Sequence, residues 1–206
     1  MLRPVHNPRV LLMNATRDKA YKLRLAPPAL ARLFGLGAAL LALMPFAAHA
    51  AEPAVNLRSK ILAGEAIVFT ANQPEAERTV PAGWLAEAAR KGVAVNLSRA
   101  VVTDPLELRH AAVTNRFRLH QCVFKAAADC SFAVFEQGFD FADSQFVASA
   151  DFTGAVARRA ALLRGTTFSG NAIFTDATAE DVFLVQGAAF LGKESKFNRA
   201  SFLAVH

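Results

Sequence analysis

Large apolar residues recur through the second half of the chain at alternating intervals of five and six residues. The alternation reaches eighteen positions, all of them apolar: Leu97, Val102, Leu108, Val113, Leu119, Phe124, Cys130, Phe135, Phe141, Phe146, Phe152, Ala157, Leu163, Phe168, Phe174, Ala179, Val185 and Phe190. In a chain that is 53% apolar, chance would produce this run roughly once in a hundred thousand trials. Phe197 then comes one residue late and Phe202 follows five later, which predicts a one-residue slip.

Small residues follow the same rhythm. They lie two residues before each marker that ends a five-residue step: Ala100, Ala111, Cys122, Ala133, Ser144, Ala155, Thr166, Ala177 and Ala188. A chain that turns after every five or six residues, with one large and one small side chain inward, closes into a four-sided coil with a 22-residue period. Markers 22 apart would then stack at about 4.8 Å, the spacing of neighbouring strands.

Two interior ladders follow from this coil. Their members are Phe124, Phe146, Phe168 and Phe190 in one, and Leu119, Phe141, Leu163 and Val185 in the other. An 11-residue period could also describe a right-handed coiled coil, but that structure needs apolar residues three and four apart. The segment is also rich in Phe, Thr, Gly, Asp and Asn, which favours strands and turns. The dense leucine pattern of a leucine-rich repeat is missing. The pattern therefore predicts an all-β solenoid of about five coils.

The stretches Ser144-Gln145-Phe146 and Ala150-Asp151-Phe152-Thr153-Gly154 resemble the pentapeptide-repeat family, in a phenylalanine-rich form. The resemblance covers residues 97 to 202 and implies a right-handed quadrilateral β-helix. Alternate steps here have six residues, and the family's usual central leucine is mostly replaced. The resemblance is specific for the fold and says little about function.

Three segments are expected. Residues 1–50 have a basic beginning, an apolar run from Leu33 to Phe46 and Ala48-His49-Ala50, the order of a signal peptide with cleavage near Ala50. An uncleaved membrane anchor is the alternative. Residues 51–96 form a capping segment with short helices, and residues 97–206 form the β-helix. We therefore expect a periplasmic or secreted protein.

The capping segment contains two helix patterns. Pro81 precedes Trp84, Leu85, Ala88 and Ala89, with Gly92 after the last turn, as in a short amphipathic helix that covers the first coil. Leu57 to Ala63 shows a similar pattern before the β-like run 66–69, and residues 71–80 are expected to form a loop. No cap pattern follows Phe202, so either a partner covers the last coil or the chain continues.

The net charge of +6 at first suggests an anionic partner. The first fifty residues contain seven of the 23 basic residues and a single one of the 17 acidic residues. From Ala51 onward, 16 basic and 16 acidic residues remain. The basic character belongs to the leader. The three charges of Arg158, Arg159 and Arg164 do not make a nucleic-acid site, so no nucleic-acid partner is expected.

No catalytic, metal or cofactor site is expected. His110 and His120 lack convergent partners and are interpreted as solvated, and Cys122 and Cys130 as buried fillers, with a disulfide as the alternative. Four aspartates are expected to face solvent or to bond turn backbone, with a cation site as the alternative: Asp129, Asp140, Asp143 and Asp151. Phe117, Phe139 and Phe183, in line with Ala161, either fill the interior or form an exposed stripe.

The leading hypothesis is an exported, non-catalytic interaction or structural module of the cell envelope, with an unknown protein partner. Peripheral association with a membrane stays open. Two alternatives come from other classes. Some pentapeptide-repeat proteins resemble DNA and bind gyrase, which needs an acidic rod in the cytoplasm, and some larger β-helices cleave polysaccharides, which needs clustered acidic and basic residues.

Overall fold

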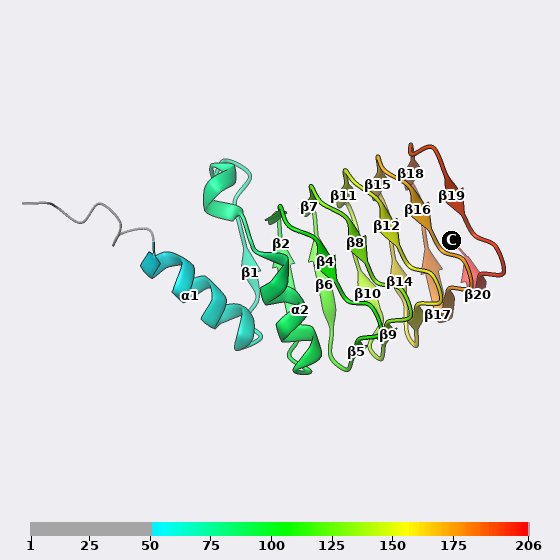
Figure 1. Cartoon of the computed structure of the whole chain (residues 1–206), viewed down its shortest axis with the longest axis horizontal. Coiled ribbons are helices and arrows are strands. Elements are labelled where there is room, and N and C mark those ends of the chain that lie inside the picture. The colour runs from blue at the N-terminus through cyan, green and yellow to red at the C-terminus, as the bar shows by residue number, and fades with distance from the viewer. Residues whose placement is uncertain (1–50, 206) are drawn as a thin grey trace, which may run out of the picture. The chain divides into compact units, whose positions relative to one another are not determined.

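The structure, a computed structural model, describes residues 51–205, and the predicted leader of residues 1–50 lies outside them. Helix α1 (Ala51–Leu62), the 3-10 helix η1 (Glu75–Arg78) and helix α2 (Ala82–Arg90) come first, and stacked coils of short strands follow (Figure 1). Within residues 51–205, no helix is both long and apolar enough to cross a membrane.

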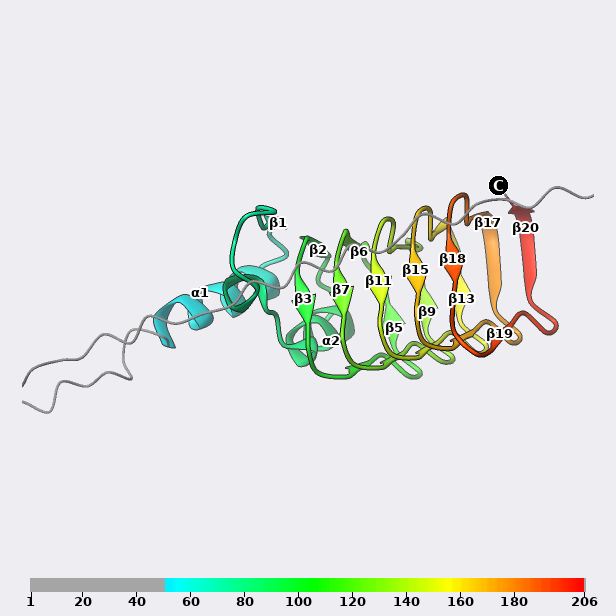
Figure 2. The ribbon, with the colours of Figure 1, turned by 90° about the horizontal axis from the view of Figure 1, so that it is seen from above.

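The coils have four sides, and every strand pair between neighbouring coils is parallel. Side one contains β1 (Ile67–Val68), β2 (Val95–Ser98), β6 (Phe117–His120), β10 (Phe139–Asp140), β14 (Ala161–Leu162) and the end of β17 (Thr178–Leu184). Side two contains β3 (Val101–Val102), β7 (Val123–Phe124), β11 (Gln145–Phe146), β15 (Thr167–Phe168) and β18 (Ala189–Phe190), which Figure 2 shows in a row.

Side three contains β4 (Leu106–Glu107), β8 (Ala128–Asp129), β12 (Ala150–Asp151), β16 (Ala172–Ile173) and β19 (Ser195–Lys196). Side four contains β5 (Ala112–Val113), β9 (Val134–Phe135), β13 (Val156–Ala157), the beginning of β17 and β20 (Ser201–Val205). Because β17 continues around a corner, it pairs with β13 on side four and with β14 on side one. The predicted four-sided β-helix is confirmed.

The register between coils is the predicted one through most of the solenoid. Phe146 pairs with Phe168, and Phe168 with Phe190. On the next side, however, Ala172 pairs with Ser195, which lies one residue beyond the position that this register requires. The predicted one-residue slip is therefore confirmed, and it lies between β18 and β19.

The interior is a stack of apolar side chains, as the spacing predicts. Sixteen of the eighteen markers are buried, and Val185 and Phe190, near the end of the solenoid, are partly buried. The rings of Phe124 and Phe146 are stacked with centroids 4.5 Å apart, and the next two pairs of the ladder follow at 5.0 and 5.1 Å. Phe117, Phe139 and Phe183 are also buried, so they fill the interior and form no exposed stripe.

At alternate corners of the coils, one residue adopts a positive φ. These residues are Arg99, His110, Gln121, Phe132, Asp143, Gly154, Gly165, Asp176, Gly187 and Arg199. One such corner is the turn formed by residues 130–133, in which Phe132 is the third residue. The amide of Ala133 donates to the carbonyl oxygen of Cys130 at 3.1 Å and closes this turn. A turn with positive φ at its third residue resembles a type II turn. The small residue of each five-residue step follows directly and enters the interior.

Hydroxyl groups at the small positions link neighbouring coils. Ser144 Oγ donates to the carbonyl oxygen of Leu119 at 2.7 Å and accepts from the amide of Cys122 at 2.9 Å. Thr166 Oγ1 donates to the carbonyl oxygen of Phe141 at 2.8 Å. These buried side chains thus satisfy backbone groups that would otherwise lack partners.

The capping segment covers the first coil. Helix α2 packs against β2, β4 and β5, and it buries Leu85 together with four alanines. Pro81 gives α2 no side-chain cap, but the carboxylate of Asp104 in the first coil accepts from the amide of Ala82 at 3.0 Å. Gly92 follows α2 at positive φ, as a helix C-terminus favours. The predicted cap helix is confirmed.

Two details of the capping segment differ from the sequence interpretation. The first helix begins at Ala51, well before the predicted start at Leu57, and ends at Leu62. The expected loop over residues 71–80 contains η1, a single 3-10 turn. Both differences lie in short stretches with weak apolar periodicity, where sequence patterns locate boundaries poorly.

Replacing Phe146 by alanine should destabilise the protein by about 3–5 kcal/mol, because it leaves a cavity between the rings of Phe124 and Phe168. Chemical denaturation monitored by circular dichroism measures the change. The control is Val147→Ala at the next residue, where the side chain is 45% exposed and the expected effect is within about 0.5 kcal/mol. Equal effects of the two substitutions would contradict the interior ladder.

Candidate functional site

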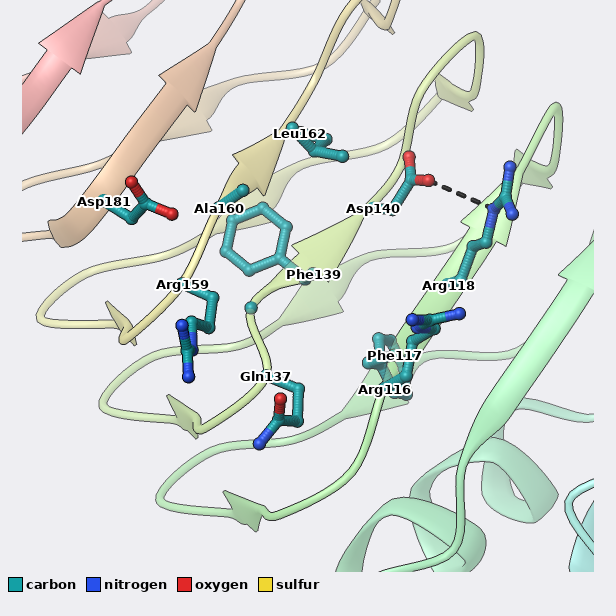
Figure 3. Close-up of a pocket in the computed structure, with 11 residues that line it drawn as sticks. Arg116, Phe117, Arg118, Gln137, Phe139, Asp140, Arg159, Ala160, Leu162 and Asp181 are labelled. Carbon is teal, nitrogen blue, oxygen red and sulfur yellow. Dashed lines mark ion pairs between the residues drawn. The ribbon is translucent and has the colours of Figure 1, made fainter.

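A groove of about 300 Å³ crosses β6, β10 and β14 on side one (Figure 3). Its floor is low because Gly138 and Ala160 occupy equivalent positions in two successive coils. Gly138 has a φ of +70°, and a Cβ there would collide with the carbonyl oxygen of Ala160. The backbone therefore requires glycine at this corner, and the absence of a side chain leaves the groove open.

Two rows of larger side chains wall the groove. Gln137, Arg159 and Asp181 stand one coil apart on one side. The other wall is formed by the outward-facing residues of the strands, namely Arg118 on β6, Asp140 on β10 and Leu162 on β14. Each row repeats at the coil spacing, so the groove runs along the axis of the solenoid.

Arg116 lies at the end of the groove nearer the capping segment. It is shared with a second hollow of about 340 Å³, which Asn96 and Asn115 also line. Asn115 Nδ2 donates to the carbonyl oxygen of Gly92 at 2.7 Å, so its side chain is held in place. Gln137 lines both hollows, and in Figure 3 it lies between Arg116 and Arg159.

The acid at the centre of the groove is already paired. Arg118 Nε lies 3.1 Å from Asp140 Oδ2, as a charge contact and not as a well-directed hydrogen bond. The other carboxylate oxygen of Asp140 accepts from the amide of Ala142 at 2.9 Å. Among the described residues, the side chains of Arg116 and Arg159 have no hydrogen-bond or ion-pair partner. The groove thus offers free guanidinium groups, which bind anions.

The two histidines considered in the sequence, His110 and His120, lie at different corners of the coils. His110 is exposed and stacks on the ring of Phe132, with centroids 5.1 Å apart. His120 is half-buried, and its Nε2 lies 3.1 Å from Asp143 Oδ2. The sequence interpretation gave His120 no partner, so this contact corrects it. The 22-residue register, applied to polar residues as well as apolar ones, would have placed Asp143 near His120 in the next coil.

Three of the four aspartates considered in the sequence accept hydrogen bonds from the turn backbone, as expected. Each accepts from the amide two residues further on: Asp129 from Ser131 at 2.9 Å, Asp140 from Ala142 at 2.9 Å and Asp151 from Thr153 at 2.8 Å. Asp143 instead contacts His120 and lies 4.0 Å from Arg164. Across residues 51–205, no group of three or more His, Cys, Asp or Glu side chains is arranged to hold a metal ion.

The sequence suggested that Arg158, Arg159 and Arg164 form one cluster, but the structure separates them. Arg158 forms ion pairs with Glu136 at 3.3 Å and Glu180 at 2.8 Å, one coil away on either side. Arg159 faces the groove, and Arg164 lies near Asp143 at another corner. The apolar repeat does not indicate the groove, because Gly138 and Ala160 occupy equivalent positions in successive coils that are not among its apolar markers.

Comparison with known proteins found no matching family model, no matching curated protein and no matching solved structure. The function of the chain is therefore inferred from the groove and from the rest of its own surface.

Both cysteines are free and buried, so the filler interpretation is confirmed. Burial raises the pKa of the Cys122 thiol to about 12, and it raises the pKa of Cys130 well above the usual range. Because only the thiolate is nucleophilic, neither cysteine in the folded protein should react with a disulfide reagent at pH 8. Both should react in concentrated urea.

A chromogenic thiol titration measures this difference. Ser149→Cys is the control, since position 149 is exposed and should supply one reactive thiol in the folded protein. Rapid reaction of the unsubstituted folded protein would show that the interior opens.

Proposed function

We propose that the chain is an exported, non-catalytic binding module of the cell envelope, built as a β-helix of the pentapeptide-repeat type. It would be periplasmic or secreted after cleavage near Ala50. The observation that carries the proposal is the groove on side one, whose two exposed arginine side chains lack partners among the described residues. Such groups are suited to holding an anionic partner.

The chemistry of the groove supports binding over catalysis. The residues that line it include no His, Ser, Thr, Cys, Lys or Tyr. Asp140, which is paired with Arg118, and Asp181 are its carboxylates. General acid–base catalysis needs a titratable group that is free to exchange a proton with the substrate, and Asp140, already held by Arg118, serves poorly in that role. Asp181 is exposed and has no partner among the described residues, but the groove lining places no second free acid or base opposite it.

The scaffold supports the same proposal. The groove lies on strands whose inner faces rest on buried side chains of the stack, Phe117, Phe139 and Ala161. A site on such a scaffold keeps its side chains in fixed register and so recognises a repetitive or extended partner well.

Cell fractionation followed by N-terminal sequencing tests the location. The expected result is a mature protein that begins at Ala51 in the periplasm or the medium. An intact chain in the cytoplasm would overturn the proposal and would favour a cytoplasmic target.

The binding role is tested on the mature protein purified from that compartment. Affinity capture from envelope fractions should enrich a specific component, and Arg159→Gln should reduce the enrichment, because that side chain lines the groove. Arg158→Gln is the matched control, since Arg158 is paired with Glu136 and Glu180. Cleavage of a polysaccharide, or inhibition of gyrase by the purified protein, would contradict the proposal.

A further inference from the structure

Most arginines in the coils have a side-chain partner within the fold, but two of them have none among the described residues. Six of the eight have a side-chain partner in the fold: Arg99, Arg109, Arg118, Arg158, Arg164 and Arg199 contact a carboxylate or a backbone oxygen. The side chains of the other two, Arg116 and Arg159, have none among the described residues, and both line the groove on side one. Their coincidence at one place suggests that their partner is a ligand.

The positions of the two arginines define a spacing along the axis. Arg116 immediately precedes Phe117, which pairs with Phe139, and Phe139 pairs with Ala161, two residues after Arg159. The two arginines therefore belong to the first and third of three successive coils. At the strand spacing, their backbones are separated by about 10 Å along the axis.

Between Arg116 and Arg159, the groove carries no charged side chain on its floor or on the wall that contains Gln137. Gln137 stands in the middle coil with its amide exposed, and the floor consists of Gly138 and Ala160. An amide can both donate to and accept from a hydroxyl group, and the flat floor admits a ring. The opposite wall holds Asp140, whose charge is balanced by Arg118.

We propose that the groove binds an acidic oligosaccharide that carries a carboxylate on every second sugar. Arg116 and Arg159 each hold one carboxylate, about one disaccharide apart, and the neutral sugar between them lies on Gly138 and Ala160 beside Gln137. This inference rests on the proposed function, because such glycans are found outside the cytoplasm and because it requires the groove to be a binding site.

The arrangement favours carboxylates over phosphates. A dianionic phosphate is held best where several cations converge on one point, whereas these guanidinium groups stand two coils apart with a neutral amide between them. A single guanidinium forms a bidentate pair with either anion, but it balances the whole charge only of a carboxylate and leaves a dianionic phosphate partly uncompensated. The groove also runs along the axis and is open, so it suits an extended chain more than a compact headgroup.

Calorimetric titration of the full mature protein tests the inference. The probe is a hexasaccharide of alternating glucuronate and N-acetylglucosamine, compared with the neutral N-acetylglucosamine hexamer and with inorganic phosphate. The expected result is saturable binding of the acidic hexamer alone, weaker at high salt because the contacts are charged. Arg116→Gln and Arg159→Gln should each weaken binding at least about 10-fold, as expected for a hydrogen bond to a charged group.

Two variants separate the groove from the general charge of the surface. Arg158→Gln removes the same charge one residue away, from a side chain paired with Glu136 and Glu180, and should leave binding within about 2-fold of the unsubstituted protein. Ala160→Trp leaves every arginine in place but fills the floor of the groove, and it should abolish binding. If the Ala160→Trp variant does not fold, Arg159→Gln tests the groove instead. The Arg159 side chain is exposed and has no partner in the described part of the chain, so its replacement should not affect folding.

Equal binding of the neutral and acidic hexamers, no saturable binding, or an equal loss from Arg158→Gln would overturn the inference. So would binding of phosphate alone. Capture of an envelope protein that depends on Arg159, without binding of the glycan, would also overturn it while leaving the proposed binding function in place. A cytoplasmic, unprocessed protein would instead remove the proposed function.

Discussion

The structure depends on the stacking of equivalent side chains in neighbouring coils at the strand spacing. Each side of a coil has only two or a few residues in the ladder, too few for a strand to be stable by itself. The coil spacing of about 4.8 Å is also close to the separation of stacked rings, 4.5 Å for Phe124 and Phe146. One repeat length therefore satisfies the backbone hydrogen bonds and the core together, and an insertion within a strand would disturb both.

The same constraint explains the small residues and the corners. A turn with positive φ at its third residue is compact enough to change direction within a five-residue step, and the next residue then points into a crowded interior. Only a small side chain fits there, and where it is Ser144 or Thr166 its hydroxyl reaches a carbonyl oxygen of the preceding coil. After β18 the chain contains one extra residue, and parallel pairing resumes on the next side, where Ala172 pairs with Ser195. The solenoid tolerates the insertion because it falls between strands.

The period, the interior ladders, the slip and the cap helix could all be predicted from the sequence, because each depends on apolar residues whose burial leaves a strong spacing signal. The groove could not, since it depends on outward-facing residues, which the fold leaves free to vary. The 22-residue register could have placed Gln137 beside Arg159, and Arg158 between Glu136 and Glu180. It could not have shown which arginines remain unpaired, because ion pairs also cross diagonally between coils, as from Arg109 to Asp129.

An exposed arginine without a partner is common, and a surface ion pair contributes little to stability, so the absence of a pair at Arg116 or Arg159 is not in itself a sign of function. The floor between the two is what marks a site. Gly138 is required by the backbone, but Ala160, one coil further, has no positive φ and could carry a large polar residue, as Arg116 does at the equivalent position two coils earlier. Its small side chain keeps the groove continuous between two free cations, and this continuity, more than the charge, distinguishes the groove from the paired surface around it.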